Sequence, residues 1–122
     1  MDENLKNDNS GNLVISENVI ASIALNAAKD VDGVSSFAAR PADVHTIFNL
    51  GDEALKSVRV WSGENDIKLQ IYINIMSGKK IPTVASEVQR AVKNAVQSMT
   101  GKIVTKVNVS IAAIDFAELN KE

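Results

Sequence analysis

The chain has 122 residues, with 13 Lys and Arg, 15 Asp and Glu, one His and a formal net charge of −2. This length suits a single domain, and the hydrophobic fraction of 45% is that of an ordinary globular protein that buries its own core. The absence of cysteine excludes disulfides, thiolate zinc sites, iron–sulfur clusters and cysteine nucleophiles.

No stretch reaches the roughly 18 consecutive apolar residues that a membrane-spanning helix needs. The N-terminal segment is polar and acidic, unlike a secretory signal. We therefore expect a cytoplasmic protein without direct membrane insertion. Its predicted organisation is a flexible tail (1–12), one domain (13–116) and a short C-terminal tail (117–122).

The charges are unevenly distributed along the chain. Residues 1–66 hold 11 acids and 5 bases, whereas residues 67–114 hold 1 acid and 7 bases. The basic residues of the second part are Lys68, Lys79, Lys80, Arg90, Lys93, Lys102 and Lys106. Two interpretations stay open: a cationic face for an anionic partner, or a fold that interleaves both parts so that the charges offset one another.

The first predicted elements are a short strand at 13–15, a helix and a second short strand at Val34–Phe37. Ser16 is a favourable N-cap for the helix. Asp32-Gly33 ends it, because Gly33 readily adopts a left-handed cap. The apolar positions of this helix recur with the helical period, whereas Leu25 falls toward the polar side; they are Val19, Ile20, Ile23, Ala24, Ala27, Ala28 and Val31.

The segment 38–56 permits two interpretations. Asp43 followed by Val44, Ile47, Phe48 and Gly51 fits a short capped helix that lies over one end of the core. A connection of this length can instead be a flexible loop that binds a partner.

Residues 58–76 predict a β-hairpin, because apolar and polar residues alternate strictly on both sides of a turn at 63–66. A four-residue turn would pair Ser62 with Ile67. Val60 would then face Leu69, and Val58 would face Ile71, so that both apolar sets lie on one face.

A second helix is predicted from about Pro82 to Thr100, followed by Gly101 in the C-terminal cap. Its apolar stripe is Val84, Val88, Ala91, Val92, Ala95, Val96 and Met99, and its polar face carries Arg90, Lys93 and Gln97. A last strand follows, in which Ile103, Thr105, Val107, Val109 and Ile111 alternate with polar residues. The order of elements predicts an α+β fold of two layers: a small mixed β-sheet with two main helices packed on one face.

The sequence resembles the alkaline shock protein family of Gram-positive bacteria, also described as an envelope stress response or general stress protein family. The resemblance covers about 11–116. Its matching stretches are Gly11-Asn12-Leu13-Val14-Ile15-Ser16, Val19-Ile20, Ile23-Ala24, Ala27-Ala28, Val31-Asp32-Gly33-Val34, Val84, Val88-Gln89, Val92, Val96, Met99-Thr100-Gly101 and Val107-Asn108-Val109-Ser110-Ile111. The linker at 39–55 and the short C-terminal tail depart from the pattern.

The resemblance implies a non-enzymatic cytoplasmic protein, held near the membrane by a membrane-anchored partner and linked to cell-envelope homeostasis. It implies no catalytic residues and no cofactor. The residues point the same way, because His45 with Asp43 offers too few ligands for a structural zinc site. Asp30 with Asp32 and Asp52 with Glu53 are typical of caps and turns. Gly78-Lys79-Lys80 lacks the spacing of a phosphate-binding loop.

Two functional hypotheses remain. The first is a scaffold that acts through protein–protein contacts, including self-association, with Leu25, Trp61 and Tyr72 as candidate contacts. The second is a nucleic-acid-binding module that uses the basic 68–106 region and a sheet face carrying Trp61 and Tyr72, because aromatic and basic side chains on a sheet can stack bases. The complete set of candidate interaction residues is Leu25, Arg59, Trp61, Lys68, Tyr72, Arg90 and Lys93.

Overall fold

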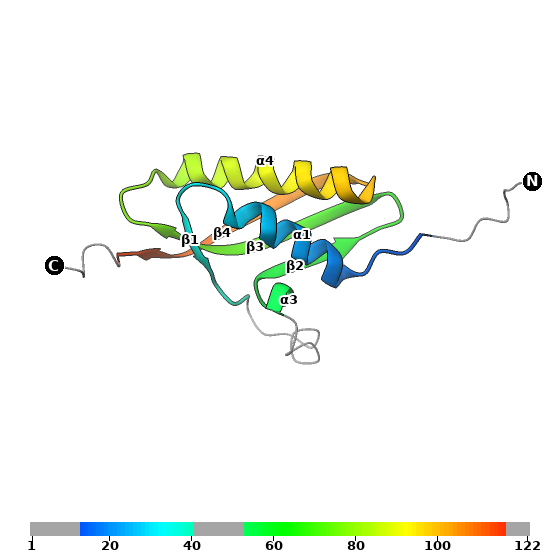
Figure 1. The fold of residues 1–122 in the computed structure, drawn as a ribbon, viewed down its shortest axis with the longest axis horizontal. Coiled ribbons are helices and arrows are strands. Elements are labelled where there is room, and N and C mark those ends of the chain that lie inside the picture. The colour runs from blue at the N-terminus through cyan, green and yellow to red at the C-terminus, as the bar shows by residue number, and fades with distance from the viewer. Residues whose placement is uncertain (1–12, 41–52, 117–122) are drawn as a thin grey trace, which may run out of the picture.

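The computed structural model describes residues 13–40 and 53–116. In chain order its elements are α1 (Glu17–Lys29), β1 (Val34–Phe37), α3 (Glu53–Ser57), β2 (Val58–Ser62), β3 (Asp66–Met76), α4 (Ile81–Thr100) and β4 (Ile103–Asp115). The helices α1 and α4 pack side by side over one face of the sheet, as Figure 1 shows. The predicted two-layer α+β fold is therefore confirmed. The predicted short helix around Asp43 and both predicted tails lie outside the described residues.

β3 is the central strand of a mixed sheet. β4 pairs with β3 in parallel on one side, while β2 and β1 pair antiparallel with successive parts of β3 on the other. The β2–β3 register joins Ser62 to Ile67, Val60 to Leu69 and Val58 to Ile71. The predicted hairpin register is thus confirmed.

The core lies between the sheet and the two helices. β3 contributes five fully buried side chains, because its strict alternation places every second residue beneath the helices: Ile67, Leu69, Ile71, Ile73 and Ile75. α4 contributes side chains at intervals of four residues, Val84, Val88, Val92 and Val96, which follow one face of a helix. α1 contributes Ile20, Ala21, Ala24 and Ala28, and these small alanines let it pack close to its neighbours.

The predicted caps of the two helices have different outcomes. Ser16 is the N-cap of α1, and its Oγ accepts a hydrogen bond from the Val19 amide at 3.2 Å. Gly101 ends α4 in the left-handed conformation, as expected. Gly33 also has a positive φ of 103°, but it does not cap α1, which ends at Lys29. It lies instead in a turn closed by a bond from the Val34 amide to the Val31 carbonyl.

The predicted apolar pattern is wrong at several positions. Residues 13–15 form no strand, and Leu13 and Val14 are exposed. Val19 and Met99 are also exposed, because each lies at the margin of its helical stripe, while Ala21 and Thr100 are buried in their helices.

The alternation of β4 shifts at its start. A bulge places Thr105 between the pairs Ile67–Val104 and Lys68–Lys106. Val104 is therefore buried, and Ile103 is 63% exposed rather than part of the core. The alternation predicted from Val107 to Ile111 is correct, because the bulge restores the expected phase.

Candidate interaction surface

The sheet has one face that none of the described helices covers. We call it the open face, and its polar and aromatic residues are Ser36, Arg59, Trp61, Asp66, Lys68, Gln70, Tyr72, Asn74, Lys106, Asn108, Ser110 and Asp115. These residues alternate along the strands with the core residues, so the pleat directs them away from α1 and α4. The open face therefore arises from the same pattern that forms the core.

Trp61 is the largest exposed side chain of the open face. Its relative exposure is 42%, and the Arg59 guanidinium carbon lies 4.9 Å from the centre of its ring. This distance is within the range of a cation–π contact. Lys68 is the direct cross-strand neighbour of Trp61, as the predicted register requires. Tyr72 lies farther along β3 and is half-buried.

Polar cross-strand contacts hold the middle of the open face. Gln70 Nε2 donates to Ser110 Oγ at 3.0 Å, which joins β3 to β4. Asn74 Nδ2 donates to Ser36 Oγ at 3.0 Å, which joins β3 to β1. These two hydrogen bonds link the side chains around Tyr72 across the strands.

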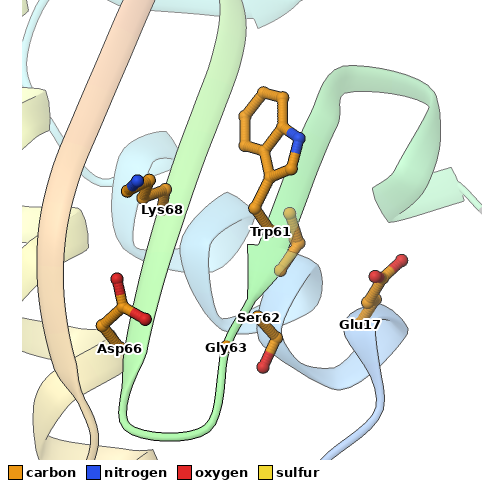
Figure 2. Close-up of a pocket in the computed structure, with 7 residues that line it drawn as sticks. Glu17, Trp61, Ser62, Gly63, Asp66 and Lys68 are labelled. Atoms are coloured by element: carbon orange, nitrogen blue, oxygen red, sulfur yellow. The ribbon is translucent and has the colours of Figure 1, made fainter.

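A hollow of about 400 Å³ lies beside Trp61. Figure 2 shows its lining: Trp61 and Lys68 extend from neighbouring strands, Asp66 and Ser62 lie near the β2–β3 turn, and Glu17 comes from the start of α1. The lining thus combines one aromatic ring, one base and two acids. Such an open, mixed hollow suits a side chain of another protein better than a buried small molecule.

The other candidate residues lie elsewhere. Leu25 of α1 is half-buried against the core and lines a separate hollow with Phe37 and Lys56. Arg90 and Lys93 are on the exposed side of α4, in the layer opposite the open face. The seven predicted residues therefore form three regions, of which the open face holds four: Arg59, Trp61, Lys68 and Tyr72.

The basic residues of 68–106 do not gather on one face. Lys68 and Lys106 are register partners on the open face. Lys79 instead forms an ion pair with Asp32 at 3.0 Å, at the far end of β3. Lys106 lies beside Lys68 because β4 pairs with β3 in parallel and in this register.

The part of the chain that the structure describes contains no cluster of three or more His, Asp or Glu side chains that could hold a metal ion. His45 and Asp52 lie outside the described residues. Within the described ranges, no helix combines the length and the apolar character required to cross a membrane.

Comparison with solved structures shows the fold. A zinc form of the MamM CTD aligns with a TM-score of 0.50 and 18% identity, over 81% of this chain and 87% of that one. A second MamM CTD structure aligns with the same TM-score and 19% identity, over 82% of this chain and all of that one.

Sequence relatives are more similar. The uncharacterized protein YqhY of Bacillus subtilis (strain 168) is 31% identical over 110 residues, which cover 87% of this chain and 78% of the relative. The uncharacterized protein Spy1535 of Streptococcus pyogenes serotype M6 is 32% identical over 106 residues, covering 85% and 79%. The family model for alkaline shock protein 23, described by a cell envelope-related function, matches residues 5–116. The chain belongs to this alkaline shock protein family, whose function is related to the cell envelope.

Proposed function

We propose that this protein acts in cell-envelope homeostasis without catalysis, as a stress-response scaffold that binds another protein through the open face. The observation that carries the proposal is Trp61, an exposed tryptophan on a sheet face that none of the described helices covers. Tryptophan and arginine are the residues most enriched at the energetic centres of protein interfaces. Trp61 and Arg59 form such a pair.

The surroundings of Trp61 indicate the chemistry of the partner. Arg59, Lys68 and Lys106 place three bases on the open face near Trp61, so an acidic segment of a protein would be attracted to these side chains, while Glu17 and Asp66 add two acids in the hollow. The hollow beside Trp61 would accept one side chain of that segment. We propose that the partner is a small membrane-anchored protein, which would hold this cytoplasmic chain at the membrane; the cell-envelope function of the family supports this assignment.

Nucleic acid is the second candidate partner, because Trp61 and Tyr72 share the open face with the basic residues Lys68 and Lys106. Single-stranded nucleic acid binds by stacking on such rings within a basic groove. The net charge of −2 and the separation of Lys79, Arg90 and Lys93 from this face favour a protein partner instead.

Trp61→Ala is expected to release the protein from membranes. Loss of a central aromatic contact typically weakens an interface by about 2 kcal/mol or more, or roughly thirtyfold. The measurement is fractionation of native lysate, with and without nuclease, for the wild type, Trp61→Ala and the control Arg90→Ala. The wild type and Arg90→Ala should sediment with membranes in both conditions, whereas Trp61→Ala should move to the supernatant.

Each alternative outcome has a distinct meaning. Release of the wild type by nuclease would replace the protein partner by nucleic acid, and charge reversal at Arg59 and Lys68 should then abolish binding. Equal sedimentation of Trp61→Ala and the wild type would show that the open face is not the binding surface.

A further inference from the structure

The outer edge of β4 is long and regular. β4 spans 13 residues and pairs with β3, and it pairs with no second strand among the described residues. Bulges at Thr105 and Ala112 enclose a regular segment from Lys106 to Ile111. An edge strand of this kind presents backbone groups that can pair with another strand.

The hydrogen-bonding pattern shows which backbone groups point outward. The bond from the Gly63 amide to the Asp66 carbonyl starts the β2–β3 ladder, so the backbone groups of Ile67, Leu69 and Ile71 point to β4. In a parallel pair, these groups bond to the residues flanking their register partners. The amides and carbonyls of Lys106, Asn108 and Ser110 are thus turned toward β3, and those of Val107, Val109 and Ile111 are turned outward.

A side-chain bond agrees with this assignment. The carbonyl of Val107 accepts a hydrogen bond from Gln89 Nε2 of α4 at 3.2 Å. This is consistent with a carbonyl that points away from β3. Beyond the second bulge, the Ser77 amide donates to the Asp115 carbonyl at 2.9 Å. The carbonyl of Asp115 therefore points toward β3, and the backbone groups of Ile114 point outward, like those of Val107, Val109 and Ile111.

The same outward-bonding residues carry apolar side chains on the helix side of the sheet. Val107, Val109, Ile111 and Ile114 are only half-buried, whereas their register partners on β3 are fully buried. A strand added at this edge would therefore cover these apolar side chains and also form hydrogen bonds with the outward backbone groups of β4.

The charged residues of β4 indicate that a second β4 strand can pair with this edge, and in which register. If two β4 strands pair antiparallel about Ser110, Val109 lies opposite the partner subunit's Ile111, and Val107 opposite the partner subunit's Ile114. Lys106 then lies opposite the partner subunit's Asp115, because the bulged Ala112 of each strand has no partner in the pairing. Moving the centre to Val109 or Ile111 would place Lys106 opposite an uncharged alanine, so the register about Ser110 is the one that pairs opposite charges.

We propose that a second copy of this chain adds to the β4 edge in this register, forming a two-fold symmetric dimer with a continuous sheet. Each side chain of the interface keeps its face, so both open faces lie on the same side of the dimer. The dimer goes beyond the proposed function and does not depend on it. It would present two Trp61 surfaces to one partner or membrane, which strengthens binding through multivalency.

Charge exchange tests the register. Lys106→Glu alone and Asp115→Lys alone each place like charges opposite one another twice in the dimer, which should weaken dimerisation roughly tenfold. The double variant Lys106→Glu/Asp115→Lys restores opposite charges and should restore the dissociation constant. The measurement is sedimentation equilibrium of the purified full chain over a range of concentrations, with Lys93→Glu on α4 as the control.

Amide exchange gives a second readout that needs no variant. At high protein concentration, the outward amides of Val109 and Ile111 should exchange more slowly than at low concentration, because they become bonded in the dimer. A wild type that stays monomeric at millimolar concentration would overturn the proposal. A dimer that both single charge reversals leave intact, or one that Trp61→Ala dissociates, would also overturn it.

Discussion

Replacing Ile71 by alanine is expected to lower the free energy of unfolding by about 3 to 4 kcal/mol, because the change leaves a cavity in a tightly packed core. Ile71 is fully buried in the central strand, between its register partners Val58 and Val109. The measurement is urea denaturation followed by circular dichroism. If the variant is unfolded without urea, Ile71→Val should fold and lose about 1 kcal/mol.

The matched control is the same substitution at Ile103. This residue is 63% exposed on β4, so Ile103→Ala should cost less than about 1 kcal/mol. The comparison also tests the bulge at Thr105, since an uninterrupted alternation would bury Ile103 and expose Val104. Equal losses for Ile71→Ala and Ile103→Ala would contradict the described register of β4.

Gly33→Ala is the second change with a large expected effect, about 2 to 4 kcal/mol, because backbone strain and steric overlap add to each other. Gly33 has a φ of 103°, which L-residues with a side chain rarely adopt. A Cβ at this position would lie 2.7 Å from Cγ2 of Val84 in α4. The turn before β1 would therefore have to move away from the helix.

Two variants separate strain from overlap. Gly101 also has a positive φ of 76°, but a Cβ there would meet no atom within 4 Å, so Gly101→Ala should cost only about 1 kcal/mol. In a Val84→Ala background, Gly33→Ala should cost less than in the wild type, because the overlapping methyl group is gone. Additive losses in this double-mutant cycle would show that Gly33 and Val84 are not in close approach.

The hairpin and the apolar stripe of α4 were predictable because local periodicity determines them. Alternation along β2 and β3 and the length of the turn together define the register of the hairpin. The bulge of β4 at Thr105 was not predictable, since its surroundings include contacts distant in sequence. There the Thr105 hydroxyl donates to Asp66 Oδ2 at 3.3 Å, and the Ile103 amide donates to the Asn65 carbonyl.

The candidate surface was predictable to the same extent. Alternation placed Arg59, Trp61, Lys68 and Tyr72 on one face, and the register confirms that Trp61 lies opposite Lys68. Lys106 joins this face through the parallel pairing of β4 with β3, whose register the alternation along one strand does not determine.

The other candidate residues lie outside the open face, and their residue types did not indicate where the fold would place them. Leu25 has an apolar character that suits a contact surface, but the packing of α1 leaves it half-buried against the core. Arg90 and Lys93 follow the helical period of α4, and this helix lies in the other layer. A charged or apolar residue type alone therefore does not indicate which layer of a two-layer fold presents it.

The most direct test of the open face as the binding surface is photo-crosslinking in living cells. A photoreactive amino acid would be placed at Lys68, beside Trp61, and separately at Arg90 on the outer side of α4. The proposed function predicts a covalent adduct with a membrane-anchored protein from position 68 and none from position 90. The same adduct from position 90 alone would contradict it and assign binding to the helical layer.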